Sequence, residues 1–400
     1  MTDRRHWVQF ARGYHAVSGL RTYPRISLDI IWLEALDQSS QNSIPLLGVL
    51  RGEGVGPEVV DAALEVLKGL HGSSGIEVEI EFGGPIGAEA HALGGNDLLP
   101  RVEEFCRGIF KRKGSVLAGA GGGRFVYDLR NRFQLFYKLN PILSYPELRG
   151  VRRLKGEFSD DVDILVVREN LGGLYQGKSR ETKGGSGVVE VEHTFSSTER
   201  QVAAVLEVAR SFAESRSGRL AVVIKDSGLP GLSALWKRMA KAVAWGNGIE
   251  CEILNVDHAV YRLVVQADSF DVIVAPNCFG DILSDLAGVF GGSRGLIFGA
   301  SYSEEGYAVY QTNHGAAHDI AGLGRANPAG QIFSIAMWLD ESLGKKKEAV
   351  SIVESVREAW RQGWRTEDVA EPGCKISSTR EFAEIVVGCL RDRFDREACV

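Results

Sequence analysis

The stretch that decides the fold is Asn277-Cys-Phe-Gly-Asp281-Ile-Leu-Ser-Asp285. It directly follows a short apolar run, residues 270–276, which we interpret as a buried strand. If a helix begins there, Asp281 and Asp285 lie four residues apart on one helical face. Two carboxylates so placed repel each other, and a divalent cation such as Mg²⁺ or Mn²⁺ would neutralise them. The alternative is a pair of acidic residues that the helix dipole stabilises near the N-terminus.

The length and composition are those of an ordinary soluble protein. With 400 residues, the chain can bury a large core and form two domains. The net charge of −6 argues against nucleic acid as the main partner. No apolar run reaches the roughly 18–20 residues that span a bilayer, so we expect no membrane partner.

The cysteines and the N-terminal region bear on the compartment. Six cysteines are scattered without a CxxC pair, which predicts reduced thiols in a cytoplasmic protein and no zinc site. Within residues 1–44, five arginines at 4, 5, 12, 21 and 25 face only one acidic residue, Asp3, before Asp29. We expect a poorly ordered N-terminal extension or an upstream start codon. The alternative is an organelle transit peptide, which has the same composition.

The chain then opens like an α/β protein. An apolar strand at 44–50 is followed by a glycine-rich turn at 51–57 and by apolar residues at helical spacing from 59 to 70. The turn lacks the GxxxxGK pattern and matches GxGxxG poorly. A second strand at 115–123 ends in glycines, but Arg124 stands where a dinucleotide fingerprint needs its third glycine. We therefore predict an α/β fold that is not a Rossmann fold.

The following segment, 124–140, is dense in positive charge, and we predict that it is helical up to Pro141. Beyond it, three apolar strands each end in a polar residue: Arg168, Lys225 and Asn277. Ligands in open α/β sheets bind at the carboxyl ends of the strands, so we expect these side chains to lie near a ligand.

Three further segments are predicted outside this region. Residues 182–194 read as an arm or hairpin. The polar, small-residue stretch 314–328 reads as a functional loop. The C-terminal part is mainly amphipathic helix without chemistry of its own.

Four motifs in order resemble one family, the metal-dependent β-decarboxylating dehydrogenases that act on isopropylmalate, isocitrate, homoisocitrate and tartrate or malate. The motifs are Leu50-Arg-Gly-Glu-Gly-Val-Gly-Pro-Glu58, Val167-Arg-Glu-Asn-Leu-Gly-Gly-Leu-Tyr175, the stretch 277–285 and the loop 314–327. The resemblance covers about residues 45–390. It implies a two-domain fold like that of isopropylmalate dehydrogenase, with a mixed sheet flanked by helices. The expected larger, cofactor-binding domain comprises 45–141 plus 292–400, and the smaller substrate, metal and dimerisation domain comprises 142–291.

The resemblance also implies roles for individual residues. Arg130 and Arg168 are expected to hold the malate carboxylates, and Tyr175 and Lys225 to transfer protons. The remaining roles divide into a metal set, Asp257, Asp281 and Asp285, and an NAD set, His314, Asp319 and Asn327. Lys225 and Asp257 are expected from the neighbouring subunit of a homodimer. An acidic Asp319 suits free ribose hydroxyls, which favours NAD over NADP.

The implied reaction explains these residue types. Oxidation at C2 of the 2-hydroxy acid gives a 2-oxo acid with a carboxylate β to the new carbonyl. Loss of CO₂ leaves negative charge on that carbonyl oxygen, which Mg²⁺ or Mn²⁺ stabilises as a Lewis acid.

Several residues depart from the family pattern. The second substrate arginine, ten residues after Arg130, is Asn140 here. One charge-assisted hydrogen bond, of about 1.5–3 kcal/mol, is therefore missing or replaced, and Lys138 or Arg132 are the candidates to replace it. Ser227 stands in place of a family asparagine. These departures keep open a second hypothesis, a catalytically weak regulatory subunit that pairs with an active homologue.

The segment 124–130 bears on which substituent the malate carries at C3. If 124–130 is helical, Arg124, Tyr127 and Arg130 lie roughly along one side, and Arg124 and Tyr127 face the substituent. An arginine there favours an anionic, isocitrate-like substrate over isopropylmalate. Alternatively, Arg124 points to solvent or pairs with Asp128, and Phe125 and Val126 would accommodate an apolar substituent.

Overall fold

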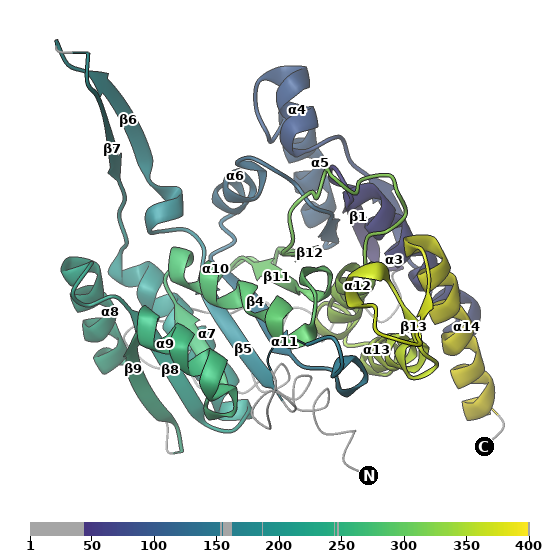
Figure 1. Cartoon of the computed structure of the whole chain (residues 1–400). Helices are drawn as coiled ribbons and strands as arrows, with labels where there is room; N and C mark the ends of the chain where they lie inside the picture. Colours follow the sequence, from purple (N-terminus) through teal and green to yellow (C-terminus); the bar gives the residue numbers. More distant parts are fainter. Residues whose placement is uncertain are drawn as a thin grey trace.

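The computed structural model describes residues 44–398 except 153, 155–161, 186, 244, 246 and 247. The predicted N-terminal extension therefore lies outside the described residues, apart from Ile44. Ten strands form one sheet in the order β2-β1-β3-β12-β11-β4-β5-β10-β8-β9 (Figure 1). Their bounds are β1 Leu46–Leu50, β2 Glu79–Phe82, β3 Ser115–Ala118, β4 Tyr137–Leu143, β5 Asp163–Glu169, β8 Arg219–Ile224, β9 Glu250–Asn255, β10 Val272–Ala275, β11 Phe298–Tyr302 and β12 Ala308–Thr312.

The sheet is mixed. Strand β4 runs antiparallel to β5 and β11, and β11 runs antiparallel to β12. The other neighbouring pairs are parallel. The sheet runs through both parts of the chain that the sequence assigns to separate domains, and β4 crosses the boundary at 141/142. The division into two domains stays a prediction.

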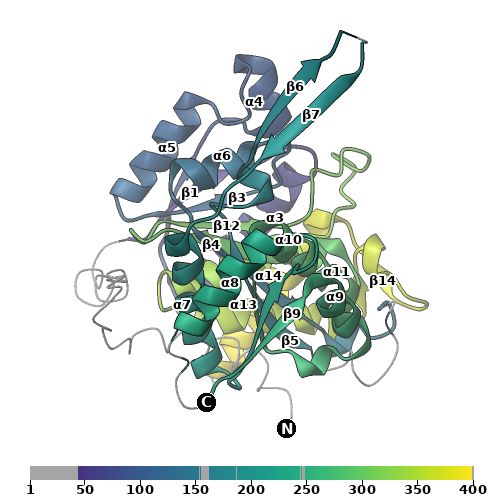
Figure 2. The same ribbon diagram turned by 90° about the vertical axis from the view of Figure 1, so that its left-hand side faces the viewer.

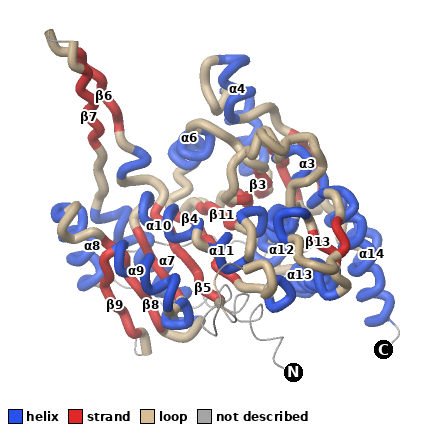
Figure 3. Tube along the Cα trace, viewed as in Figure 1, coloured by secondary structure: helices blue, strands red, loops and turns tan. Residues whose placement is uncertain are grey.

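Helices cover both faces of the sheet (Figure 3). Their bounds are α3 Gly56–Ser74, α4 Gly87–Gly94, α5 Pro100–Lys111, α6 Phe125–Arg132, α7 Glu199–Ser215, α8 Pro230–Ala242, α9 Val256–Val265, α10 Asn277–Asp285, α11 Ala287–Gly291, α12 Ala329–Glu341, α13 Lys346–Arg361 and α14 Thr379–Ala398. Along β10, Val272 and Val274 join one hydrophobic core while Ile273 and Ala275 join another. A strand buried on both faces reads as a continuous apolar run, as 270–276 does. The predicted α/β fold with a mixed sheet flanked by helices is confirmed.

The predicted helix up to Pro141 is wrong beyond Arg132. Helix α6 ends at Arg132, and Tyr137–Leu143 is strand β4 in the middle of the sheet. Gln134 adopts a left-handed backbone with a φ of 50°, which turns the chain out of the helix. Pairing with β5 and β11 then determines the conformation of the following residues.

The predicted arm is a hairpin of β6 Lys178–Lys183 and β7 Val189–Thr194. All residues of both strands are exposed, and the hairpin projects far from the rest of the chain (Figure 2). Within the described ranges, no helix combines the length and apolar character that crossing a bilayer requires.

Candidate active site

A cavity of about 260 Å³ opens between α6, the strands β4 and β5, helix α10 and the stretch after β12. Its lining residues are Ala120, Gly121, Val126, Tyr127, Arg130, Lys138, Arg168, Asp281, Asp285, Arg294, Gln311, Thr312, Asn313, His314 and Gly315. Of the predicted site residues, it brings together Tyr127, Arg130, Arg168, Asp281, Asp285 and His314. The others lie outside the lining: Arg124, Asn140, Tyr175, Lys225, Asp257, Asp319 and Asn327.

Arg168 is fixed at the carboxyl end of β5. Strands β5 and β10 are parallel neighbours, with Ala275 in register with Arg168, so Asn277 follows beside it. The Nε and Nη2 atoms of Arg168 donate to Oδ1 of Asn277 at 3.0 and 2.8 Å. The Asn277 amide donates in turn to the carbonyls of Asn170 and Gly172. Both side chains are buried, so the guanidinium orientation is set before any ligand binds.

Arg130 reaches the cavity from α6 and is 3% exposed. Its Nε and Nη1 atoms are buried and form no hydrogen bond to the described residues. Burial, and then the positive charge of Arg168, lower the pKa of Arg130 to about 9. A buried guanidinium with unused donors is suited to an anionic ligand.

Lys138 also lines the cavity, from the start of β4, and is 2% exposed. Its Nζ donates to Oδ1 of Asn313 at 2.5 Å, and the Asn313 amide donates to Oδ1 of Asn140 at 2.6 Å. Burial, and then the charges of Arg130 and Arg168, lower the pKa of Lys138 well below its ordinary value. Arg132, the other candidate to replace the missing arginine, instead pairs with Glu103 at 2.9 Å at the surface.

The two carboxylates of α10 face these cations. Asp281 accepts a hydrogen bond from Nη1 of Arg168, and Asp285 pairs with Arg294 at 3.0 Å. Burial raises the pKa of Asp285, and the neighbouring charge of Asp281 raises it further against the opposing effect of Arg294. Oxygen donors on one helical face beside a polar cavity fit a hard divalent cation.

Asp257 does not join the other two aspartates within one chain. It pairs with Lys225, whose Nζ lies 2.9 Å from its Oδ1, and this hydrogen bond lowers the pKa of Asp257. In the part of the chain that the structure describes, no three His, Cys, Asp or Glu side chains gather closely enough to hold a metal. A complete three-aspartate site therefore requires a second source for the third ligand.

Tyr175 lies on the short 3₁₀ turn Leu174–Gln176, beside the cavity. Its ring centroid lies 5.5 Å from the ring centroid of Tyr127 and 5.7 Å from the guanidinium carbon of Arg168. Burial, and then a hydrogen bond with the Cys278 thiol, raise the pKa of Tyr175. Within one chain, its hydroxyl is therefore a weaker acid than that of an ordinary tyrosine.

Arg124 lies outside the cavity lining, and its guanidinium carbon is 5.3 Å from the ring centroid of Tyr127. Its side chain is 54% exposed, its Nε lies 3.6 Å from Oδ1 of Asp128, and its Nη2 donates to the carbonyl of Tyr175 at 3.4 Å. The pairing with Asp128 at i+4 is the alternative that the sequence left open for this arginine.

The predicted cofactor loop contributes two residues to the lining, His314 and Gly315. Nδ1 of His314 lies 3.0 Å from the carbonyl of Gly315, its Nε2 is buried without a partner among the described residues, and burial lowers its pKa. Asp319 is exposed. Asn327 is 5% exposed, and its amide is engaged by Asp368 and by the backbone of Ala329 at the start of α12.

The sequence reading missed Asn313 and Arg294 as residues of the site. Arg294 lies in the glycine-rich stretch that follows the α10 motif, and Asn313 directly precedes the predicted cofactor loop, so proximity to both motifs was the available signal.

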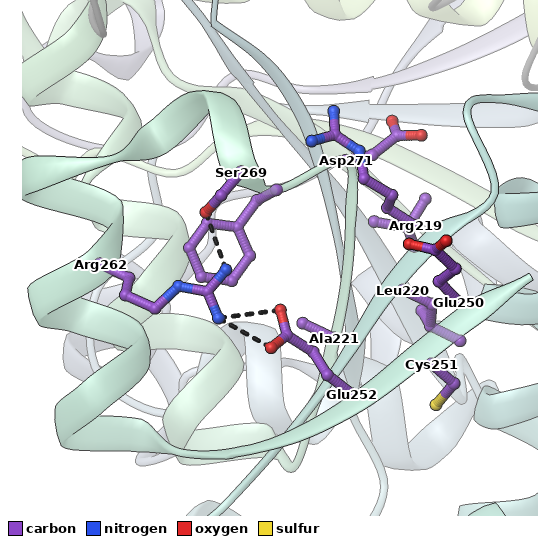
Figure 4. A pocket seen from close by; sticks show the side chains of 11 residues that line it. Arg219, Leu220, Ala221, Glu250, Cys251, Glu252, Arg262, Ser269 and Asp271 are labelled. Atoms are coloured by element: carbon purple, nitrogen blue, oxygen red, sulfur yellow. Dashed lines mark hydrogen bonds and ion pairs between the residues drawn. The ribbon is translucent and has the colours of Figure 1, made fainter.

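A second hollow, of about 350 Å³, lies at the opposite ends of β8, β9 and β10 (Figure 4). Arg262 is held there by both carboxylate oxygens of Glu252, at 3.0 and 2.7 Å, and by the Ser269 hydroxyl. Arg219 donates to the carbonyl of Asp268. Because these cations already have partners, the hollow offers a ligand little unsatisfied charge.

Comparisons with known proteins show the family of the chain. The family model described as isocitrate/isopropylmalate dehydrogenase matches residues 46–386. A 3-isopropylmalate dehydrogenase from Halalkalibacterium halodurans is 34% identical over 366 residues, which are 87% of this chain and 98% of the relative. One from Heyndrickxia coagulans is 36% identical over 360 residues, covering 86% and 96%. The crystal structure of isocitrate dehydrogenase from Methylococcus capsulatus matches with a TM-score of 0.77 at 29% identity, covering 87% of this chain and 99% of that one. The chain belongs to the isocitrate/isopropylmalate dehydrogenase family, whose members are decarboxylating dehydrogenases acting on CH–OH.

Proposed function

We propose that the protein catalyses the NAD-dependent oxidative decarboxylation of a 3-substituted malate, of the isocitrate or isopropylmalate type, to a 2-oxo acid and CO₂. The observation that carries the proposal is the cavity itself. Three buried cations, Arg130, Lys138 and Arg168, face two carboxylates, Asp281 and Asp285. Cations that converge beside a pair of aspartates suit a ligand that is both an anion and a metal chelator, which a 2-hydroxy acid is.

The arginines would bind and orient the substrate. Arg168 is held by Asn277, so its guanidinium presents a fixed direction to a carboxylate. The Nε and Nη1 atoms of Arg130 have no hydrogen-bond partner among the described residues and can donate to a ligand. Together they would fix both ends of the malate core, which places C2 and the leaving carboxylate in a defined orientation.

The aspartates of α10 fit Mg²⁺ or Mn²⁺. Their oxygen donors match the preference of these ions, and each carboxylate is balanced by an arginine that an incoming cation would displace. When bound, the metal would supply Lewis-acid stabilisation of the oxyanion formed on decarboxylation. Asp257 of a second subunit would complete the set.

Proton transfer would fall to Tyr175 and Lys225. Tyr175 is protonated at neutral pH, as an ordinary tyrosine is, and would protonate the carbanionic product. Because burial raises its pKa, a positive charge beside the hydroxyl, such as the partner's Lys225, would be needed to favour that transfer. Lys225 lies outside the cavity of its own chain, beside Asp257. Within a homodimer, Lys225 and Asp257 would both act in the site of the other subunit, whereas Tyr175 would act in the site of its own chain.

NAD would bind beside the substrate. His314 lines the cavity with a buried, unpartnered Nε2, which fits a ligand with hydrogen-bonding groups. Asp319 is exposed, so its carboxylate could accept from ribose hydroxyls and would repel a 2′-phosphate. The side-chain amide of Asn327 is already hydrogen-bonded within the chain, so Asn327 would support NAD binding by holding the loop in place. The cytoplasm remains the proposed location.

A regulatory subunit is the second candidate, favoured by one observation. The amide of Asn140, at the position of a family arginine, is tied to Asn313 instead of facing the cavity. The presence of Tyr175, Lys225 and three aspartates favours an active enzyme, since a subunit without catalysis need not keep them.

The deciding experiment mixes the purified protein with Mn²⁺, NAD and a panel of substituted malates. NADH is followed by absorbance and CO₂ release is measured separately. We expect both with one substrate. Ligand binding without either product would instead support the regulatory subunit.

A further inference from the structure

We propose that Lys138 is a substrate-binding residue that supplies the third positive charge to a carboxylate of the malate core. This inference rests on the proposed function and names a residue that the family pattern does not provide at that place. Its basis is a buried lysine that lines the cavity together with two arginines and donates a hydrogen bond to Asn313.

The position on the strand is the first argument. Lys138 and Asn140 are two residues apart on β4, so their side chains leave the same face of the sheet. Asn313 contacts both, accepting from Lys138 and donating to Asn140. The positive charge that the resemblance places at 140 is thus present two residues earlier, on the same face and within the same hydrogen-bond network.

A glycine on the neighbouring strand makes room for this arrangement. A Cβ on Gly299 of β11 would lie 2.3 Å from the carbonyl oxygen of Leu139, and also 3.0 Å from Oδ1 of Asn140 and 3.2 Å from Cε of Lys138. Any larger residue at 299 would crowd both side chains. The lysine stem crosses β11 at this point, which accounts for its reach to Asn313 although the two residues are far apart in sequence.

The charge balance is the second argument. Lys138 is 2% exposed, and among the described residues its Nζ forms a hydrogen bond only with the neutral amide of Asn313. The nearest acids are already engaged, Asp281 by Arg168 and Asp285 by Arg294. A buried ammonium without a carboxylate partner is costly, which agrees with the lowered pKa of Lys138, and an anionic ligand in the same cavity favours the charged form.

The test compares malate binding, measured by calorimetry, with kcat/KM on the best substrate of the panel. Lys138→Met keeps the length of the side chain and removes the charge, and Lys138→Gln serves as a second, polar version. Each is expected to weaken malate binding and raise KM roughly 10- to 100-fold, the loss of one charge-assisted hydrogen bond. Arg132→Met, which removes a surface cation from the same segment, is the matched control and should change both within about 2-fold.

A relocation variant sharpens the assignment. The double substitution Lys138→Asn with Asn140→Arg returns the charge to position 140 and should recover about 10-fold of the lost affinity. Thermal unfolding of every variant confirms that the fold is retained. A purely structural role for Lys138 would lower the melting temperature without this rescue.

The outcomes separate the two proposals. If the wild type oxidises a substrate and Lys138→Met and Lys138→Gln keep wild-type malate affinity and KM, the role of Lys138 is overturned while the proposed function stands. If the wild type oxidises no substrate, and yet binds malate in a way that depends on Lys138, the role of Lys138 stands and the proposed catalytic function is overturned. If the wild type neither binds malate nor oxidises any substrate, both are overturned.

Discussion

Arg168 and Asp281 form an ion pair inside the cavity, with Nη1 of the buried arginine donating to Oδ1 of the aspartate. The arginine side chain is 3% exposed and the aspartate 38%, so the aspartate is the partner that can turn toward a ligand. A carboxylate substrate and a metal ion would divide this pair between them: the substrate takes the arginine and the metal takes the aspartate. Substrate and metal are therefore expected to bind cooperatively.

The metal requirement gives the first prediction. Asp281→Asn keeps the size of the side chain and removes the charge, and we expect turnover to fall by about two orders of magnitude or more, because a metal ligand is lost. The fold should be retained but the melting temperature lowered, because Arg168 is 3% exposed and loses its carboxylate partner. Asp392→Asn, an exposed acid on α14, is the control. Wild-type turnover that persists in excess chelator would contradict the prediction.

Shared sites give the second prediction. Lys225→Ala and Tyr175→Phe are each expected to be inactive alone, because each lacks one proton-transfer group. Mixed under conditions of subunit exchange, they should form hybrids with one intact site and regain up to about a quarter of wild-type activity, the value for random exchange between dimers with two independent sites. Mass measurement of tagged hybrids verifies the exchange. Hybrids that form without any activity would mean that both residues act within one chain.

Glu169 gives a prediction on stability and pH. It is buried, and its Oε1 accepts from the backbone of Leu171 and Gly172. Burial raises its pKa from 4.5 to about 7. The folded state thus holds this proton more tightly than the unfolded state does. The resulting contribution to the free energy of unfolding is fully present below about pH 4.5 and is lost as the pH rises through 7.

Glu169→Gln mimics the protonated form, because an amide oxygen can accept the same two bonds. We expect the variant to match the wild type near pH 4.5 and to be more stable at pH 8 by about 1–3 kcal/mol. Denaturant unfolding at both pH values measures this, with Glu65→Gln on the exposed face of α3 as control. A stability difference that is equal at both pH values would disprove the assignment.

Substrate choice gives the last prediction on catalysis. Arg124 is half-exposed and pairs with Asp128, whereas Val126 and Tyr127 line the cavity. We therefore expect Arg124→Ala to change kcat/KM for isocitrate-type and isopropylmalate substrates equally, by less than about 3-fold. A loss of about 1.5–3 kcal/mol confined to the charged substrate would show instead that Arg124 reads an anion. The ratio of the two kcat/KM values is the measurement.

Much of the fold follows from local patterns. Continuous apolar runs predict the strands around β10, and polar residues at their ends predict the convergence of Arg168 and Asn277, because neighbouring parallel strands end at one edge. The four-residue spacing of Asp281 and Asp285 likewise predicts their shared helical face.

What the sequence could not predict depends on long-range contacts. The helix prediction for 137–140 failed because a left-handed Gln134 and pairing with β5 and β11 override local propensity. The network of Lys138, Asn313 and Asn140 joins residues more than a hundred positions apart, so no local pattern reveals it. The separation of Asp257 from the other aspartates is also a tertiary property.

The hairpin of β6 and β7 has a consequence for measurement. Two strands alone are marginally stable in water, and here Val189 and Val191 are 52% and 65% exposed. The amide protons of the hairpin should exchange with deuterated solvent far faster than those of β5 whenever nothing covers it. If a second chain covers it, their exchange slows with rising protein concentration, and the hairpin becomes a built-in reporter of assembly.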